Sequence, residues 1–281
     1  MTHVITTIVT GDGALKDFRV LLFTLEQYYK DPPTVYVFTN SATVWKNVAY
    51  KGILHRKETL NEYQNLSRAQ LERLPGQRFK TRWTDFMCEK INALRWAFNE
   101  HPGLDGSWFL DADITLLGPL PSRPDDCDLA LSPHYIRPQD EAKYGRYNGG
   151  FLWMRHPKFL DAWEEATKTS RFYEQAALEA VATTAEHLHE FPIQINFGWW
   201  RLWQSTEDSS VIQSQFGFNR NGDGIGLTFR GVALGSVHTH WGEKTDYHTA
   251  TFNKLILKFL ETLGKHKPAA DFRAMIRRTF D

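Results

Sequence analysis

The chain has very little cysteine and no surplus of charge of either sign. Its two cysteines, Cys88 and Cys127, offer neither a disulfide framework nor a Cys-x-x-Cys metal pair, and their scarcity indicates a reducing compartment. Lysine plus arginine and aspartate plus glutamate each number 33, and no broad basic face is apparent. A neutral chain of this kind does not favour a nucleic-acid partner.

Long hydrophobic runs are also missing. No run approaches the length that crosses a bilayer, and residues 1–6 have neither the basic region nor the apolar core of a signal peptide. We therefore expect a cytoplasmic protein without a transmembrane segment. Lysines and Arg273 flank apolar positions near the C-terminus, which would suit peripheral contact with a membrane surface, but we expect this segment to pack against the domain.

The rest of the composition is that of a folded protein rich in aromatic residues. The 281 residues suffice for one large domain or two small ones, and 42% of them are hydrophobic and 23% charged. Ten Trp, ten Tyr and nineteen Phe stand out. Aromatic faces suit sugar rings, although we expect most of these side chains to fill a core.

The N-terminal pattern predicts a parallel sheet. Strands are predicted at residues 4–9 and 34–39, separated by a tight loop at 10–13 and a helix from Leu15 to Tyr29 with apolar side chains at helical spacing. A strand-helix-strand opening is typical of an α/β fold with parallel strands. Residues 41–80 give no clear pattern.

Elements beyond residue 80 follow from periodicity and from breaker residues. They are a helix over 84–99, a strand that carries Asp111, a loop over 118–147, a strand over 151–154, a largely helical stretch over 157–181, an irregular stretch over 191–230, a strand over 232–237 and a C-terminal helix around 255–263.

The strongest chemical signal is an apolar run, residues 107–110, that ends in Asp111 and Asp113. A buried carboxylate is costly unless a cation neutralises it, and the carboxyl ends of strands in open α/β sheets bind ligands. Hard divalent cations take oxygen ligands and often keep substrate phosphates in their shell. The run therefore predicts a site for a metal ion and a phosphorylated substrate, with both carboxylates on one face if the strand continues.

His238 and His240 also lie two residues apart at a predicted strand end. A neutral imidazole can complete a metal shell that carboxylates begin, so one of the two is a candidate ligand. Asn148-Gly149-Gly150 allows close backbone approach to a ligand, and the asparagine amide can bind sugar hydroxyls.

Further side chains are candidates for contacts with a phosphate or a sugar, with Arg82 and Lys80 among those for a phosphate. Lys90 lies on the flank of a helical apolar stripe, where it either faces the ligand edge of the sheet or extends along the surface. Glu174 and Gln175 could bind hydroxyls or stabilise a cationic sugar carbon, and Lys244 could hold a phosphate. Gly11-x-Gly13 is not a dinucleotide fingerprint, because Lys16 occupies the position of the third glycine.

Taken in order, these features resemble nucleotide-sugar glycosyltransferases of the GT-A fold, in particular the retaining group that includes glycogenin and the family 8 galactosyltransferases. The resemblance spans residues 4–245. It implies a Rossmann-like α/β domain with a mixed, mostly parallel sheet flanked by helices over residues 1–245. Residues 246–281 would form a helical extension packed on that domain.

The resemblance also assigns roles to individual residues. Asp111, Asp113 and either His238 or His240 match the metal ligands, and Lys244 matches the lysine on the donor diphosphate. The donor site so implied contains Thr10, Gly11, Lys90, Asp111, Ala112, Asn148, Gly149, Gly150 and Lys244. Glu174 and Gln175, together with Asp111, are the residues expected at the reacting carbon.

The activity implied is transfer of a sugar from a UDP- or GDP-sugar to a carbohydrate or other hydroxyl acceptor, with Mn²⁺ or Mg²⁺. The chain departs from the family where Gly242 and Lys244 follow His238 without the family's spacing or its Pro-Trp, and where Glu174 replaces an aspartate. Retention is expected, but inversion stays open and would need a base such as Glu174 or Asp246. The side chains expected to stack on sugars are Trp153, Trp199, Trp200 and Trp241.

Two alternatives have their own support. Asp111-Ala112-Asp113 also matches the motif of haloacid-dehalogenase-type phosphatases, in which Asp111 would be the nucleophile, and residues 221–224 resemble their late acidic loop. Against this, a complete strand-helix-strand unit precedes the motif, and no lysine lies between Lys168 and Lys244. A non-catalytic nucleotide-sugar binding protein on the same scaffold is the second alternative.

Overall fold

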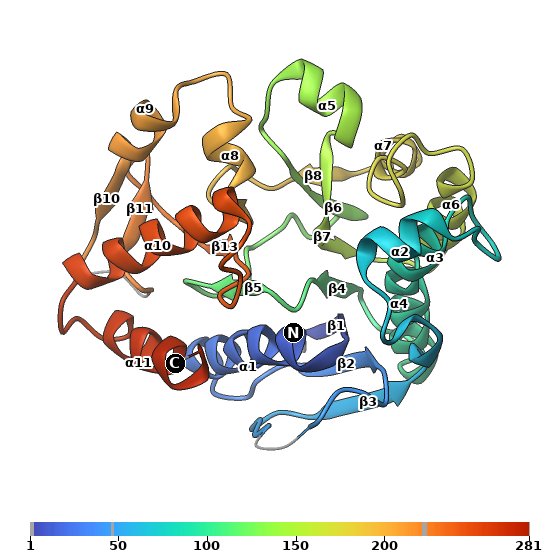
Figure 1. Cartoon of the computed structure of the whole chain (residues 1–281), viewed down its shortest axis with the longest axis horizontal. Coiled ribbons are helices and arrows are strands. Elements are labelled where there is room, and N and C mark those ends of the chain that lie inside the picture. Colours follow the sequence, from blue (N-terminus) through green and yellow to red (C-terminus); the bar gives the residue numbers. More distant parts are fainter. Residues whose placement is uncertain (1–2, 46–47, 221–223, 281) are drawn as a thin grey trace.

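The computed structural model describes residues 3–45, 48–220 and 224–280. A seven-stranded sheet forms its centre, in the order β3-β2-β1-β4-β7-β6-β8 (Figure 1). Its strands are β1 (Val4–Val9), β2 (Thr34–Thr39), β3 (Leu54–Glu58), β4 (Ser107–Leu110), β6 (Leu129–Pro133), β7 (Tyr147–Met154) and β8 (Leu188–Glu190). Only β7 runs antiparallel to its neighbours β4 and β6, which confirms the predicted mixed, mostly parallel α/β sheet.

Helices cover both faces of this sheet. The apolar side of α1 (Gly11–Tyr28) packs on residues of β1, β2 and β4 in one core cluster. On the other face, α4 (Glu89–Glu100), α6 (Lys158–Thr167) and α7 (Leu178–Ala182) pack on β4, β6 and β7. Because β2, β4 and β7 are buried along their whole length, their side chains carry no polar alternation, as expected for a sheet between two helical layers.

A second core lies beside the carboxyl ends of β1 and β4. Two small sheets border it: β5 (Ile114–Leu116), β13 (Ser236–His238) and β9 (Phe197–Gly198) form one, and the meander β10 (Phe216–Phe218), β11 (Leu227–Phe229) and β12 (Val232–Ala233) forms the other. Side chains of β9, β11 and β13 contribute to this core. The helices packed on it are α8 (Trp200–Trp203), α9 (Ser209–Ser214), α10 (Tyr247–Thr262) and α11 (Ala269–Phe280). Figure 1 shows α11 alongside α1, so the C-terminal helices join the N-terminal half of the fold.

Several sequence predictions need correction. The tight loop expected at 10–13 is the first turn of α1, and the helix expected over 84–99 is two helices, α3 (Arg82–Met87) and α4, because the chain turns at Cys88. The predicted loop 118–147 contains β6 and α5 (Pro138–Tyr144). These segments escaped prediction because short apolar stretches between prolines do not reveal tertiary pairing.

Other predicted bounds were also inexact. The stretch 157–181 is helical only in α6 and α7, the stretch 191–230 contains short helices and strands, and the strand expected over 232–237 is split into β12 and β13. Asn148-Gly149-Gly150 lies inside β7 rather than before it. In the segment without a clear pattern, the structure has β3, a 3₁₀ turn (Asn61–Tyr63) and α2 (Arg68–Arg73). Of the helices in the described ranges, none combines the length and apolar character that a membrane span requires.

Candidate metal and donor site

Asp111 and Asp113 lie in the short turn between β4 and β5. The strand ends at Leu110, and the amide of Ile114 donates to the carbonyl of Asp111 across the turn (3.1 Å). β5 pairs antiparallel with β13, and this register sets His238 opposite Ile114. The pairing of segments more than a hundred residues apart therefore brings His238 against the two carboxylates.

Asp111, Asp113 and His238 form a compact cluster of ligand atoms, all within 4.8 Å of one another. The Nε2 atom of His238 is 3.2 Å from Asp113 Oδ1 and 3.8 Å from Asp111 Oδ2. Two carboxylates and one imidazole are ligands that suit Mn²⁺ and related divalent cations. These three ligand groups therefore fit the divalent cation expected from the sequence.

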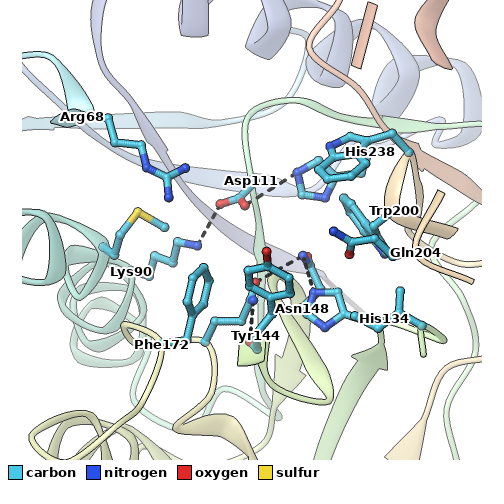
Figure 2. Close-up of a pocket in the computed structure, with 14 residues that line it drawn as sticks. Arg68, Lys90, Asp111, His134, Tyr144, Asn148, Phe172, Trp200, Gln204 and His238 are labelled. Atoms are coloured by element: carbon cyan, nitrogen blue, oxygen red, sulfur yellow. Dashed lines mark hydrogen bonds and ion pairs between the residues drawn. The ribbon is translucent and has the colours of Figure 1, made fainter. Parts of the chain in front are cut away.

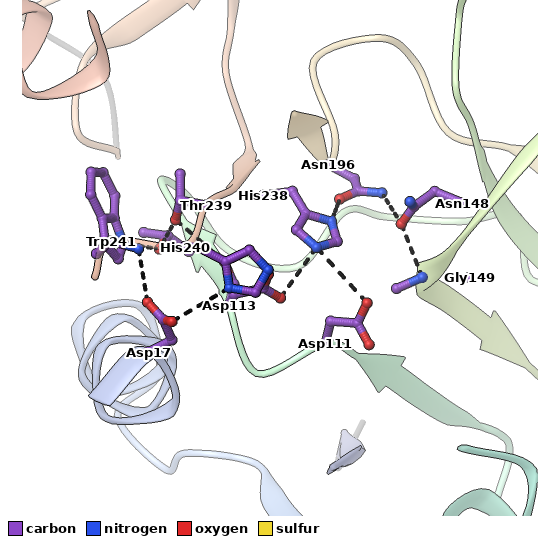
Figure 3. Close-up of polar contacts among 12 residues, drawn as sticks. Asp17, Asp111, Asp113, Asn148, Gly149, Asn196, His238, Thr239, His240 and Trp241 are labelled. Atoms are coloured by element: carbon purple, nitrogen blue, oxygen red, sulfur yellow. Dashed lines mark hydrogen bonds and ion pairs between the residues drawn. The ribbon is translucent and has the colours of Figure 1, made fainter. Parts of the chain in front are cut away.

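Asn196 fixes which nitrogen of His238 faces this cluster (Figure 3). Its Oδ1 lies 3.0 Å from His238 Nδ1, and its Nδ2 donates to Asn148 Oδ1 (3.0 Å) and to Ser132 Oγ (3.1 Å). An amide oxygen only accepts, so Nδ1 carries the proton and Nε2 turns toward the carboxylates. The lone pair of Nε2 is then directed at the space beside the two carboxylates, where it can ligate a cation.

The network continues to the far wall of the site. Asn148 Nδ2 is 3.4 Å from Nε2 of His134, whose Nδ1 is 2.8 Å from the carbonyl of Gly145. Burial lowers the pKa of His134 to about 4, so this imidazole is neutral and accepts from Asn148. Every hydrogen bond that links His238 to Gly145 is therefore donated in the same direction, from His238 toward the carbonyl of Gly145.

A buried arginine holds the segments that carry this network. Arg201 is 1% exposed, and its guanidinium donates to the carbonyls of Pro133 and Ile195, both at 2.7 Å. Burial lowers the pKa of Arg201 to about 9. Asn196, directly after Ile195, has a φ of 57°, a left-handed conformation that asparagine adopts more readily than most residues.

Asn196 is expected to act as a positioning residue for His238. Replacing it by glycine keeps the left-handed backbone but removes the acceptor for Nδ1, so the affinity for Mn²⁺ should fall by about 10- to 100-fold. Asn196→Asp, which retains the acceptor, should lose less. Titration of Mn²⁺ followed by electron paramagnetic resonance measures this directly, and equal affinities of the glycine variant and the parent would contradict the assignment.

His240 contacts the same aspartate from the opposite side. Its Nε2 is 2.9 Å from Asp113 Oδ2 and its Nδ1 is 3.7 Å from Asp17 Oδ2. The charge of Asp113 raises the pKa of His240 to about 11. Burial would raise the pKa of Asp113, but the charges of His238 and His240 outweigh it and hold that pKa well below its usual range. In the geometry described, His238 belongs to the ligand cluster and His240 supports Asp113 from outside it.

Lys90 is buried between two carboxylates and does not extend along the surface. Its Nζ is 3.0 Å from Glu174 Oε1, 3.3 Å from Asp111 Oδ1 and 3.3 Å from the carbonyl of Gly149. Burial favours the neutral amine, but Asp111 and Glu174 outweigh this effect and raise the pKa of Lys90. Lys90 therefore stays charged and holds the Asp111 carboxylate in place.

Glycines in β7 make room for these side chains. A Cβ at Gly150 would collide with Asp111 Oδ2 and would lie 2.7 Å from His238 Cε1. A Cβ at Gly149 would lie 3.0 Å from Glu174 Oε1. The close approach that the Asn-Gly-Gly sequence predicted is therefore to the protein's own polar side chains.

Two cavities meet at this cluster, each of about 370 Å³. Both are lined by Arg68, Met87, Lys90, Asp111 and His238. The first cavity extends from this shared wall toward His134, Ile136, Tyr144, Asn148, Phe172, Gln175, Trp199, Trp200 and Gln204 (Figure 2). The second extends toward Ile8, Thr10, Ala14, Asp17, Trp83, Phe86, Ala112, Asp113 and His240.

The structure does not place every expected residue at the cavities. Glu174 is 1% exposed, lies under Lys90 and lines neither cavity, whereas its neighbour Gln175 lines the first. Lys244 is exposed and lines neither, and Gly11 in the first turn of α1 is outside both linings. Asp246 accepts from the amide of Thr249 as the cap of α10.

Of the four tryptophans expected to meet sugars, only Trp199 and Trp200 line a cavity. Trp153 is 1% exposed in the central core, and the indole of Trp241 donates to Thr115 Oγ1 (3.0 Å). Trp153 is buried within β7 and Trp241 beside β5. Composition alone could not distinguish these core tryptophans from the two that line a cavity.

Sequence reasoning missed Asp17, Arg68, His134 and Asn196. Asp17 is a buried acid on the apolar side of α1. An acidic residue at a helix position where an apolar one is expected could have indicated a functional residue. The other three lie in segments without a periodic pattern, and only the fold brings them to the site.

The fold is that of GT-A glycosyltransferases. A structure of the galactosyltransferase LgtC in complex with donor and acceptor sugar analogs is similar to it, with a TM-score of 0.52, 10% sequence identity and coverage of 98% of this chain and 95% of that one. A structure of the bifunctional glycosyltransferase WbbM gives a TM-score of 0.50 at 8% identity, covering 99% of this chain and 51% of that one.

Mouse xyloside xylosyltransferase 1 gives a TM-score of 0.48 at 10% identity, with 89% of this chain and 99% of that chain covered. At the level of sequence, no family profile and no curated protein matches the chain. The structural similarity establishes the fold. Because the sequence identities are so low, the activity has to be argued from the site.

The phosphatase alternative fits this architecture poorly. The strand before Asp111 is the fourth along the chain and follows a complete strand-helix-strand unit. Residues 221–223 of the acidic loop that supported this alternative lie outside the described residues.

Proposed function

We propose that the chain is a metal-dependent glycosyltransferase that moves a sugar from a nucleotide-diphosphate donor to a hydroxyl acceptor. The observation that carries the proposal is the cluster of Asp111, Asp113 and His238 where two cavities meet, at the carboxyl edge of a GT-A sheet. Ligands of open α/β sheets bind at this edge.

Asp111, Asp113 and His238 would hold Mn²⁺ or Mg²⁺, with oxygen and imidazole ligands that suit these ions. When bound, the cation supplies Lewis-acid stabilisation of the negative charge that develops on the leaving diphosphate. Lys90 keeps Asp111 oriented, and Asn196 keeps the Nε2 of His238 directed at the cluster.

The second cavity suits the nucleotide end of the donor. It begins at Thr10, directly after β1, and the aromatic side chains of Trp83 and Phe86 line it. Aromatic faces of this kind can stack on a nucleobase.

The first cavity suits the transferred sugar and the acceptor. Trp199, Trp200, Tyr144 and Phe172 provide aromatic surface there, and Asn148 and Gln175 provide amides for hydroxyl groups. The Oε1 atom of Gln175 is 3.4 Å from the amide nitrogen of Gly149 and its Nε2 donates to the Tyr144 carbonyl (2.9 Å), so its position is fixed.

The charges in the first cavity support retention of configuration. An inverting reaction needs a carboxylate base facing the acceptor, and Asp111, a metal ligand in this proposal, is the one carboxylate lining that cavity within the described ranges. Glu174 and Asp246, the bases considered for inversion, lie under Lys90 and at the cap of α10.

A thermal-shift panel of UDP- and GDP-sugars, with and without Mn²⁺, tests the proposal, because a ligand that prefers the folded state raises the melting temperature. We expect stabilisation by one donor that depends on Mn²⁺, followed by release of the nucleotide diphosphate when that donor is incubated with the protein. Binding without release would favour a non-catalytic nucleotide-sugar binding protein, and no stabilisation by any donor would overturn the proposal.

A further inference from the structure

We propose that Arg68, at the start of α2, binds the diphosphate of the donor and supplies the positive charge that the family resemblance assigns to Lys244. This inference rests on the proposed function. It starts from the charges that line the two cavities.

The cations available in the cavities are few. Apart from histidines, the positively charged residues lining them in the described part of the chain are Lys90 and Arg68, and both line both cavities. Lys90 already faces two carboxylates, Asp111 at 3.3 Å and Glu174 at 3.0 Å, so its charge is more than balanced. A diphosphate at the shared wall would therefore find the less compensated positive charge at Arg68, which pairs with one carboxylate, Glu72, at 2.7 Å.

The chain holds Arg68 in position without using up its donors. Nε of Arg68 donates to Glu72 Oε1 (2.7 Å), and the Tyr173 hydroxyl donates to the same oxygen (2.6 Å). The guanidinium lies over the ring of Trp83, 5.0 Å from its centroid, and 5.8 Å from that of Tyr173. A guanidinium fixed at Nε and over an aromatic ring keeps its Nη1–Nη2 edge for a planar or bidentate anion.

The direction of the side chain agrees with this role. Figure 2 shows the guanidinium of Arg68 pointing toward Asp111, with Lys90 beside it. The Arg68 side chain keeps 58% of its surface exposed, so a ligand can reach it. The start of α2 is itself fixed, because Ser67 and Gln70 form a reciprocal cap one residue before and two residues after Arg68.

The test compares nucleotides that differ only in phosphate. Arg68→Gln retains much of the side-chain stem over Trp83 but loses the charge, and Arg68→Lys retains a charge but loses the planar fork. With Mn²⁺ present, calorimetric titration with UDP, UMP and uridine, and with GDP, GMP and guanosine, gives the affinity for each. We expect Arg68→Gln to lower the affinity for the nucleoside diphosphate by about tenfold or more, and Arg68→Lys to lower it by less. The affinity for the nucleoside should change by less than about twofold.

Arg73→Gln is the matched control, because Arg73 is an exposed arginine on the same short helix that lines neither cavity. Equal diphosphate affinities of the parent and Arg68→Gln would overturn the inference while leaving the proposed function intact. An equal loss for nucleoside and diphosphate would also overturn it, since it would indicate a distorted cavity. If the parent binds no nucleotide and no inorganic pyrophosphate, the proposed function and the inference both fail.

Discussion

Replacing Asp113 by asparagine is expected to lower metal-dependent sugar transfer about a thousandfold or more. The Asp113 carboxylate is 6% exposed and lies 3.2 Å from His238 and 2.9 Å from His240, inside the ligand cluster. Lewis-acid stabilisation by a bound cation contributes several kcal/mol, and each 1.36 kcal/mol changes a rate about tenfold. Asparagine keeps the shape of the side chain and removes its charge.

The measurement is release of nucleotide diphosphate from the donor that the thermal-shift panel selects, at saturating Mn²⁺. Asp111→Asn should behave similarly, because Asp111 belongs to the same cluster. Asp31→Asn, an exposed aspartate between α1 and β2, is the control and should be unaffected. Turnover of Asp113→Asn within threefold of the parent, in a variant that melts normally, would show that this carboxylate does not serve the reaction.

Replacing Lys90 by methionine should cost the largest amount of folding stability, about 3–5 kcal/mol. The change leaves Asp111 and the 1% exposed Glu174 without their common cation, and one oxygen of Glu174, Oε2, already has no hydrogen-bond partner. Chemical denaturation of the parent and the variant measures the loss. A loss below about 1 kcal/mol would mean that these carboxylates are neutral or solvated.

A second substitution separates lost charge pairing from lost packing. Adding Glu174→Gln to Lys90→Met removes the unpaired buried charge and should recover part of the loss of folding stability. A loss that Glu174→Gln leaves unchanged would indicate that packing, and not charge, accounts for it.

The sequence allowed good prediction where the pattern is local. β1, β2 and the helix between them follow from periodicity, and the apolar run into Asp111 and Asp113 marks the sheet edge. The order of chemical groups along the chain then supported the GT-A fold, which the comparison with LgtC bears out.

The parts that escaped prediction depend on contacts between distant segments. Asn196 meets His238 across 42 residues, and Tyr173 meets Glu72 across 101. Helical spacing placed Lys90 on a flank but could not show that Glu174 and Asp111 would bury it. Lys244 follows the histidines closely in sequence, yet the turn after β13 leaves it exposed, so proximity along the chain was a poor guide to the charges of the site.

Anomalous diffraction from crystals grown with Mn²⁺ and a nucleoside diphosphate would locate the cation itself. We expect one strong manganese peak in contact with Asp111, Asp113 and the Nε2 of His238, with diphosphate oxygens completing the coordination. A fully occupied nucleotide with no manganese at these three side chains, or a manganese ion bound elsewhere, would contradict this expectation.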